Sequence, residues 1–269
     1  MICARRVALN SSQLDQVNDA VVIRSIETAD GKENFSAVSV AGGCGQRITN
    51  HHRDTLDVVV RFAIRIKKND LAGRAAVLEA VNEWAARAAE SAWLTVNYKT
   101  NRRMRVTLVQ APGEGSLWDF NKDFQITFRA YNVPYWQETT AGSTAEITTA
   151  ATSGETSMTV GGNTDTVADV TLTNGSNSTV DVCSVTVDGN TMSFSGLGLA
   201  AGESLVIDHS ADGVLRIRIQ DSEEEYRSVM SKRTPSSVDD LWCKKGTRFV
   251  GFEADHNCTF TASCKGRYL

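Results

Sequence analysis

One strand with a fixed end constrains the fold of this chain more than any other stretch. Residues 124–137 read FQITFRAYNVPYWQ, and Phe124, Ile126 and Phe128 alternate with polar neighbours. This period of two is typical of a half-buried β-strand. Pro134 lacks the backbone N–H that a sheet ladder needs and pushes the preceding residue into an extended or turn geometry, so the strand ends there.

The chain changes character after this strand, from helix and strand patterns to a Thr-, Ser- and Gly-rich sequence. We therefore predict a hinge at Pro134–Trp136 between two domains, residues 1–137 and 138–269. Lys and Arg outnumber Asp and Glu by 18 to 14 up to Gln137, and acidic residues dominate by 18 to 10 after it. Such a split would suit a chain that assembles with neighbours, although chance would also produce it.

The first domain reads as an α+β unit. Asp57 to Ile66 alternates apolar residues on one face, and Asn69 or Asp70 can cap a helix over 71–90. A hairpin is predicted from Trp93–Tyr98 and Met104–Leu108, before the strand at Phe124. The apolar stripe of the helix should comprise Leu71, Ala75, Leu78, Val81, Trp84 and Ala88, with Arg74 off it.

The second domain reads as an antiparallel β-sandwich. A hairpin is predicted from 146–149 and 156–160 around Thr152-Ser153-Gly154, followed by short strands about every ten residues. The expected strands are Asp169–Thr173, Cys183–Val187, Thr191–Phe194, Ser204–Ile207, Val214–Ile219, Arg248–Glu253 and Cys258–Ser263. The predicted fold class is mainly β with one α-helix.

The chemistry-bearing residues do not form a catalytic or metal motif. His51-His52 are neighbours without further ligands at a suitable spacing, and Glu223–Glu225 is typical of a solvated loop. The densest soft-ligand group is Cys243, His256, Cys258 and Cys264, whose spacing favours buried structural thiols over zinc or disulfides. We expect no catalytic residues, no cofactor and no metal, and we interpret the chain as a non-enzyme.

The candidate binding residues lie at a basic hairpin tip: Tyr98, Lys99, Arg102, Arg103 and Arg105. Basic residues beside aromatics can bind phosphate backbones. However, alternation of Arg103 and Arg105 with apolar residues is typical of a sheet with one solvated face. We favour a solvated or subunit-contacting surface over a nucleic-acid site, and the net charge of −4 agrees with that choice.

The sequence gives no sign of a membrane segment. No stretch approaches the ~20 apolar residues of a membrane-spanning helix, and Arg5 and Arg6 are not followed by the apolar core of a secretory signal. Synthesis in a cytoplasm is the expectation.

Taken in order, several stretches resemble the distal tail (Dit) proteins of long-tailed bacteriophages. In the first domain these are Gly45–Ile64, the helix DLAGRAAVLEAVNEWA, the hairpin WLTVNYKTNRRMRVTLVQ and the strand DFQITFRAYNVPYW with its aromatic exit. Downstream, VTLTNGSNSTVDVCSVTV, ESLVIDHSADGVLRI and WCKKGTRFVGFEAD resemble the galectin-like sandwich of that family. The long Thr-rich entry to the second domain and the six cysteines depart from the pattern.

The resemblance implies a structural protein of the virion at the tip of a phage tail, assembled in the host cytoplasm. Such proteins form a hexameric ring whose N-terminal domains surround a channel through which the genome passes. They bind the tail tube protein on one side and the hub or tail-tip protein on the other. The resemblance implies neither a membrane partner nor sequence-specific nucleic-acid binding. Exposed edges or hairpins would join neighbouring subunits, and we expect the Trp93–Leu108 hairpin to be that arm.

Two other functions remain open at this point. A carbohydrate-binding module would need exposed aromatics beside polar partners, and the aromatics of the second domain fall mostly at positions that look buried. A tail tube or tube-terminator subunit would polymerise into tubes, whereas a ring protein should stop at one or two rings.

Overall fold

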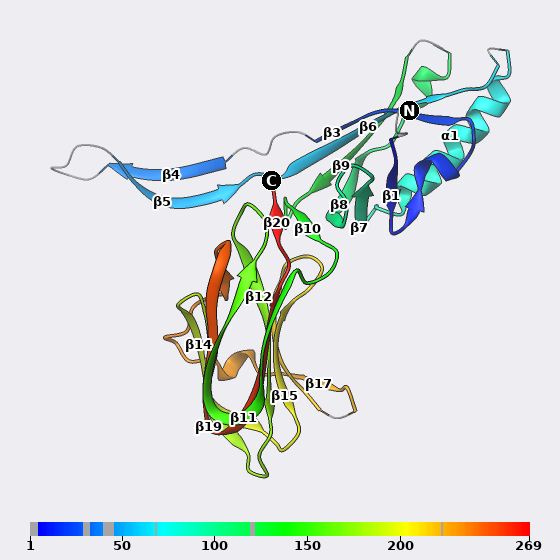
Figure 1. Cartoon of the computed structure of the whole chain (residues 1–269). Helices are drawn as coiled ribbons and strands as arrows, with labels where there is room; N and C mark the ends of the chain where they lie inside the picture. Colours follow the sequence, from blue (N-terminus) through cyan, green and yellow to red (C-terminus); the bar gives the residue numbers. More distant parts are fainter. Residues whose placement is uncertain (1–4, 29–32, 40–45, 68, 119–121, 222) are drawn as a thin grey trace. The chain divides into compact units, whose positions relative to one another are not determined.

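The computed structural model divides into two compact units, Met1–Trp136 and Gln137–Leu269 (Figure 1). It describes residues 5–28, 33–39, 46–67, 69–118, 122–221 and 223–269. Antiparallel strands dominate both units, and these residues contain a single α-helix. The predicted fold class, mainly β with one helix, is confirmed.

A twisted antiparallel sheet forms the first unit, in the strand order β2-β1-β7-β8-β9-β6-β3. Its central strands alternate buried apolar residues with less buried residues of mixed polarity, so one face is packed and the other is partly open. The strands are β1 (Val7–Leu9), β2 (Ser12–Gln13), β3 (Val21–Thr28), β6 (Leu56–Ile64), β7 (Ala92–Val96), β8 (Arg102–Gln110) and β9 (Phe124–Ala130).

The helix α1 (Leu71–Ala86) packs on the apolar face of this sheet. Asp70 caps it by accepting a 2.8 Å hydrogen bond from the Gly73 N–H. Trp84 is fully buried, with its ring edge-on to Phe128 at 6.0 Å between centroids. The indole N–H donates to the Ser12 carbonyl over 2.8 Å. This anchor holds the helix to both strand β9 and strand β2.

The predicted stripe of the helix was partly wrong. Arg74 is buried and donates from its guanidinium to the Ile64 carbonyl, whereas Ala75 is exposed. A long side chain can reach a backbone acceptor from the buried face, which apolar periodicity alone does not anticipate. The helix also ends four residues earlier than predicted. The N–H groups of Arg87 and Ala88 bond to carbonyls three residues back, which tightens the chain into turns.

The hairpin expected to be an arm lies inside the sheet. Strand β7 pairs with β1 and β8, and β8 pairs with β7 and β9, so only the turn between them protrudes from the ladder. A different hairpin, β4 (Glu33–Ser39) with β5 (Gln46–Arg53), forms a two-stranded sheet of its own. His51 and His52 lie on β5, but their side chains fall outside the described part of the chain.

The second unit is a sandwich built around two very long strands, β11 (Ser143–Val160) and β19 (Gly246–Cys264), which pair along their length. Residues Val250–Ala254 of β19 also pair with β13, and Cys258–Cys264 pair with β12. The sheet therefore folds over on itself, and Phe252 and Phe260 from the two halves stack at 5.6 Å in the core.

Shorter strands complete the sandwich in the order β14-β13-β19-β12-β15-β16-β17. They are β12 (Thr166–Asn174), β13 (Val180–Val187), β14 (Asn190–Leu199), β15 (Ser204–His209), β16 (Leu215–Gln220) and β17 (Tyr226–Ser228). Strand β18 (Trp242–Cys243) pairs with β12. Strands β20 (Arg267–Tyr268) and β10 (Trp136–Glu138) pair with each other and are not part of the sandwich sheet.

The predicted hairpin around Thr152-Ser153-Gly154 was wrong, because β11 runs through it as one strand. Its register against β19 shifts between Ile147 and Ala151 and again before Ser153, so surplus residues form bulges instead of a turn. The strands expected at Arg248–Glu253 and Cys258–Ser263 are likewise one strand. Strands β11 and β19 pair with each other along their full length. Local turn preferences in the sequence do not reveal this long-range pairing.

Four cysteines, Cys183, Cys243, Cys258 and Cys264, are free and buried, as the thiol interpretation predicted for them. Burial raises the pKa of Cys183 to about 12. The thiols therefore behave as small apolar core residues. Cys3 and Cys44 lie outside the described residues. Among the described residues, no helix is both long enough and apolar enough to cross a membrane.

Candidate functional site: the basic turn of the first sheet

The turn between β7 and β8 carries the predicted binding residues. The Lys99 N–H donates to the Val96 carbonyl at 3.1 Å, and the Arg102 N–H donates to the Lys99 carbonyl at 3.3 Å. Asn101 takes the left-handed conformation, φ 58°, which Asn tolerates better than most residues. These bonds fix a compact turn in which Tyr98 is 54% exposed.

Two arginines share one aromatic ring beside the turn. In the β7–β8 register Trp93 lies opposite Arg105, and all three side chains occupy the face away from the apolar core. The guanidinium carbon of Arg103 lies 3.9 Å from the Trp93 ring centroid, and that of Arg105 lies 5.4 Å away. The ring thus gathers two cations on one surface by cation–π attraction.

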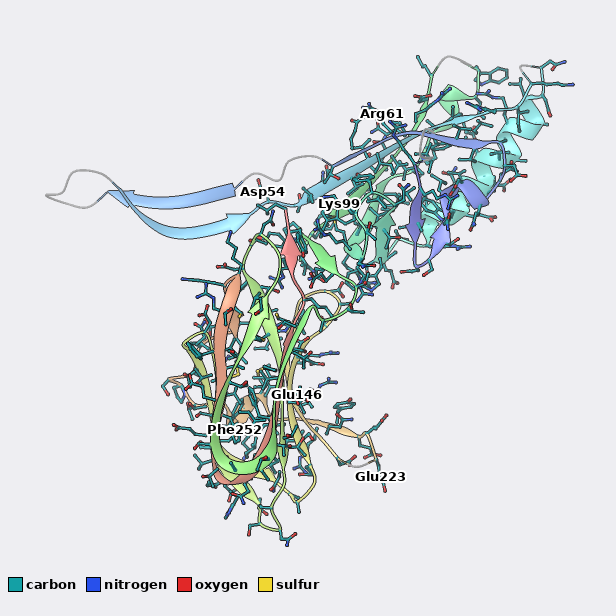
Figure 2. All side chains as sticks on the ribbon, viewed as in Figure 1. Asp54, Arg61, Lys99, Glu146, Glu223 and Phe252 are labelled. Carbon is teal, nitrogen blue, oxygen red and sulfur yellow. The ribbon has the colours of Figure 1, made fainter. Side chains whose placement is uncertain are left out.

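Lys99 occupies a partly buried position over a second ring. Its ammonium lies 5.1 Å from the centroid of Trp136, which is fully buried. Lys99 is labelled in Figure 2. Burial, and then the charge of Arg102, lower the pKa of Lys99. Burial and then Arg105 lower the pKa of Arg103 in the same direction. In both cases burial is the larger cause and the neighbouring positive charge the smaller one, and an approaching anion would stabilise both charged forms.

The fold brings a further basic residue, Arg6, to this turn. Asn97 accepts from the Arg6 backbone N–H at 3.1 Å, and its own N–H donates to the Arg6 carbonyl at 3.2 Å. Arg6 also forms an exposed ion pair with Asp15 at 3.6 Å. The sequence interpretation missed this because β1 is only three residues long, VAL, and gives too short a pattern to place.

The resulting surface is therefore a basic cluster: Arg6, Lys99, Arg102, Arg103 and Arg105, with Tyr98 and Trp93 among them. The five predicted site residues are together, since they belong to one turn and the strand that follows it. Chemically the cluster offers fixed guanidiniums and an exposed phenol ring. An acidic protein surface is its natural complement.

A second polar cluster, in the other unit, was not predicted at all. His209 lies at the end of β15 with 9% of its side chain exposed; its Nδ1 is 3.1 Å from Asp169 and its Nε2 is 3.0 Å from Asp240. Burial lowers the pKa of His209, but the two carboxylates outweigh burial and raise it to about 9. The aspartates lie 40 and 31 residues from His209 in the chain, so no local motif could reveal the cluster.

This Asp169–His209–Asp240 cluster holds the segment before β18 against the sandwich. Asp240 precedes Leu241, whose carbonyl accepts from the Ala168 N–H at 3.0 Å. Both ring nitrogens are already occupied by carboxylates, so the imidazole serves as a cationic link between strands. Among the described residues no group of three His, Cys, Asp or Glu side chains could hold a metal ion.

Comparison with known proteins finds similarity in structure but not in sequence. No protein-family model matches the sequence, and no curated protein matches it. The structure of the SPP1 Dit (gp 19.1) protein, titled a paradigm of the hub adsorption apparatus in phages that infect Gram-positive bacteria, matches with a TM-score of 0.66. Identity is 14%, over 99% of this chain and 100% of that one.

A chain of the phage P2 baseplate in its activated conformation with Ca matches with a TM-score of 0.52 and 8% identity, over 98% of both chains. The same baseplate with Sr gives the same values. The resemblance read from the sequence is thus confirmed at the level of structure, and the chain has the fold of the SPP1 Dit protein along nearly its whole length.

Proposed function

We propose that this chain is a structural component of a phage tail tip or baseplate, and that copies of it close into a ring. The ring connects the tail tube to the hub and host-adsorption proteins, with residues 1–137 forming the ring and the galectin-like sandwich of residues 138–269 lying peripherally. From the resemblance to that family, we expect six subunits in the ring. The observation that carries the proposal is the match to the SPP1 Dit protein over 99% of this chain.

The unpartnered hairpin supports self-association. Within the described residues β4 and β5 pair only with each other, and an isolated two-stranded hairpin is marginally stable in water. A neighbouring copy would supply the missing contacts, and rotational symmetry would repeat the contact until the ring closes. We propose β4–β5 as the principal arm and the basic cluster as a second contact.

Charge also supports assembly between unlike surfaces. Basic residues dominate the first half of the chain and acidic residues the second. A basic cluster on a ring-forming unit can meet an acidic surface on a neighbouring subunit or on a tail partner. The tube or tube-terminator alternative shares the sheet-and-helix architecture and differs in its product, which would be a long tube.

Electron microscopy of the purified full-length chain in negative stain tests the proposal. Single or paired rings are expected. Long tubes would favour the tube subunit instead, and monomers at all concentrations would contradict self-assembly.

A deletion variant sharpens the test. The register between β3 and β6 extends to Thr28 opposite Val58, so residues 29–55 can be replaced by a short Gly-Ser turn without breaking that ladder. This variant should keep its helix content and melt cooperatively but form no rings. Rings of normal size from this variant would exclude β4–β5 as the arm.

A further inference from the structure

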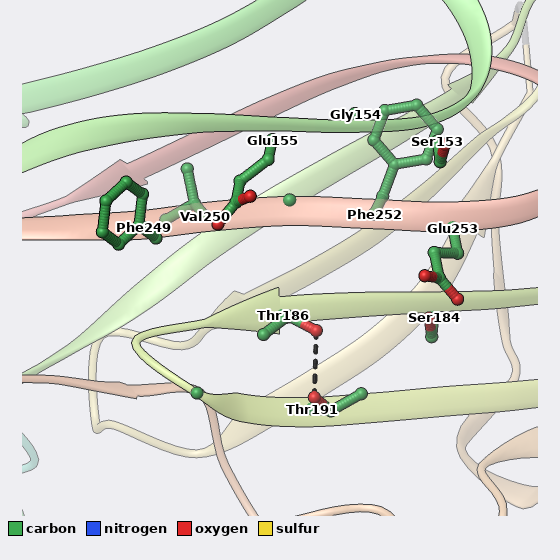
Figure 3. Close-up of a pocket in the computed structure, with 12 residues that line it drawn as sticks. Ser153, Gly154, Glu155, Ser184, Thr186, Thr191, Phe249, Val250, Phe252 and Glu253 are labelled. Carbon is green, nitrogen blue, oxygen red and sulfur yellow. Dashed lines mark hydrogen bonds between the residues drawn. The ribbon is translucent and has the colours of Figure 1, made fainter.

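The outer face of the sandwich carries an open pocket of about 630 Å³, built on strands β11, β19, β13 and β14 (Figure 3). Its lining includes no residue of the basic cluster or of the His209 cluster. The lining residues come from the first half of β19 and its neighbours: Ser153, Gly154, Glu155, Ser184, Thr186, Gly189, Thr191, Phe249, Val250, Gly251, Phe252 and Glu253.

The pocket is a gap in a row of side chains, created by a glycine. Along β19 the outward positions are Phe249, Gly251 and Glu253, because Val250 and Phe252 point into the core. The cross-strand partners of Gly251 are Glu155 on one side and Thr186 on the other. A Cβ at Gly251 would lie 2.5 Å from the Gly154 carbonyl oxygen, so close strand packing requires a bare backbone here.

An aromatic ring and several side-chain oxygen atoms surround the bare backbone of Gly251, which is the floor of the pocket. Phe249 is 67% exposed on a regular strand, where its ring finds no place in the core. Across the floor, the hydroxyls of Thr186 and Thr191 bond to each other at 2.9 Å, as the dashed line in Figure 3 marks. The remaining polar walls are the hydroxyls of Ser153 and Ser184 and two carboxylates.

The charge of the walls restricts the ligand. Both charged lining residues, Glu155 and Glu253, are acidic, and neither forms an ion pair with a residue that the structure describes. An anion would therefore be repelled, whereas a neutral molecule with many O–H donors would find acceptors on two sides. A pyranose ring also has an apolar C–H face that packs on an aromatic side chain.

We propose that this pocket is a saccharide-binding site for neutral sugars. The C–H face of one sugar ring lies against Phe249 above the bare backbone of Gly251. Its hydroxyls donate to Glu155 and Glu253 and exchange hydrogen bonds with the threonine pair. The sequence interpretation disfavoured a sugar site because the aromatics of this half looked buried; the exposure of Phe249 removes that objection.

The inference goes beyond the proposed structural role, because ring assembly requires no ligand in this pocket. A low-affinity site on one chain becomes effective when a ring presents several copies to a glycan surface. Binding by a single chain, however, does not depend on the ring.

Saturation-transfer NMR on the full-length chain tests the proposal, since it observes the sugar and works for large assemblies. The probes are lactose, cellobiose and chitobiose at millimolar concentration. At least one should receive saturation, strongest at its ring C–H protons. Phe249→Ala should weaken that binding roughly tenfold, as expected for loss of an aromatic contact.

Two variants provide the controls. Tyr226→Ala removes another half-exposed aromatic, on strand β17, and should leave binding unchanged. Glu155→Gln keeps the shape of the wall and should weaken binding without altering the melting temperature. Saturation of none of the three probes overturns the proposal, as does equal saturation with Phe249→Ala. Transfer that requires added CaCl₂ and survives Phe249→Ala would also overturn it, in favour of a cation site.

Discussion

The guanidinium of Arg103 lies 3.9 Å from the centre of the Trp93 ring, on the solvated face of the sheet and next to Arg105. The contact holds a cation whose pKa is lowered by burial in a fixed position beside the β7–β8 turn. Such a preorganised charge loses little side-chain entropy when an anionic partner arrives.

Reversing charge at this turn should therefore weaken assembly. We expect Arg102→Glu with Arg103→Glu to lower the oligomer fraction in light scattering, with the deficit shrinking at high salt as repulsion is screened. The matched control is Arg65→Glu with Lys67→Glu, exposed residues between β6 and α1 that undergo the same charge change. If both pairs behave alike, the effect is one of net charge and the turn is not a contact.

The helix anchor should dominate the stability of the first unit. Trp84→Ala removes a fully buried ring and its hydrogen bond to Ser12, and should cost about 3–5 kcal/mol in the free energy of unfolding. Chemical denaturation of the full-length chain measures it. Glu79→Ala, on the exposed side of the same helix, should change stability by less than about 0.5 kcal/mol; an equal loss from both would contradict the packing described here.

The His209 cluster should make stability fall at alkaline pH. The folded pKa of about 9 lies above the ordinary value of 6.5, so the protonated imidazolium stabilises the fold. That contribution is complete below about pH 6.5 and is lost as pH rises through about 9. At about 1.4 kcal/mol for each tenfold change in proton affinity, it amounts to about 3 kcal/mol at most.

Denaturation at pH 6, 8 and 10 compares the wild type with His209→Gln. The variant should be less stable at pH 6 and should lose most of the pH dependence in this range. His256→Gln, a histidine of the same unit outside the cluster, should keep the wild-type profile. A wild-type curve that is flat between pH 6 and 10 would show that the imidazole is not held as a cation.

Reductant and chelator should leave the fold unaffected. The four described cysteines are free, buried and poorly ionised, so neither DTT nor EDTA has a bond to remove in that part of the chain. Thermal melting with and without each reagent measures this. A drop of several degrees with DTT would reveal a disulfide, and a drop with EDTA a structural metal.

Local patterns predicted those elements whose period is regular. Strand β9 alternates from Phe124 to Ala130 and ends before Pro134, and both features are visible in the sequence. The pairing of β11 with β19 could not be predicted, because a Thr-Ser-Gly stretch favours a turn unless a partner strand over 80 residues away imposes a bulge. Asp169 and Asp240 are hidden from His209 in the same way, because they lie 40 and 31 residues from it in the chain.

The two candidate surfaces, the basic turn and the pocket around Gly251, also differ in how far the sequence could predict them. The basic turn is contiguous in sequence, so its five residues could be identified, while the cation–π contact with Trp93 follows from strand register. The pocket around Gly251 depends on side chains from four strands that meet only in the folded sheet. Its central glycine looks, in the sequence alone, like an unremarkable interruption of a strand.

The long pair of β11 and β19 has a consequence for how the second unit comes apart. Because the same two strands pass through both layers of the sandwich, neither layer can detach without tearing a ladder that the other layer shares. Partial opening is therefore suppressed, and the unit should unfold as one cooperative block. A load pulling on one layer would therefore be carried by the whole unit.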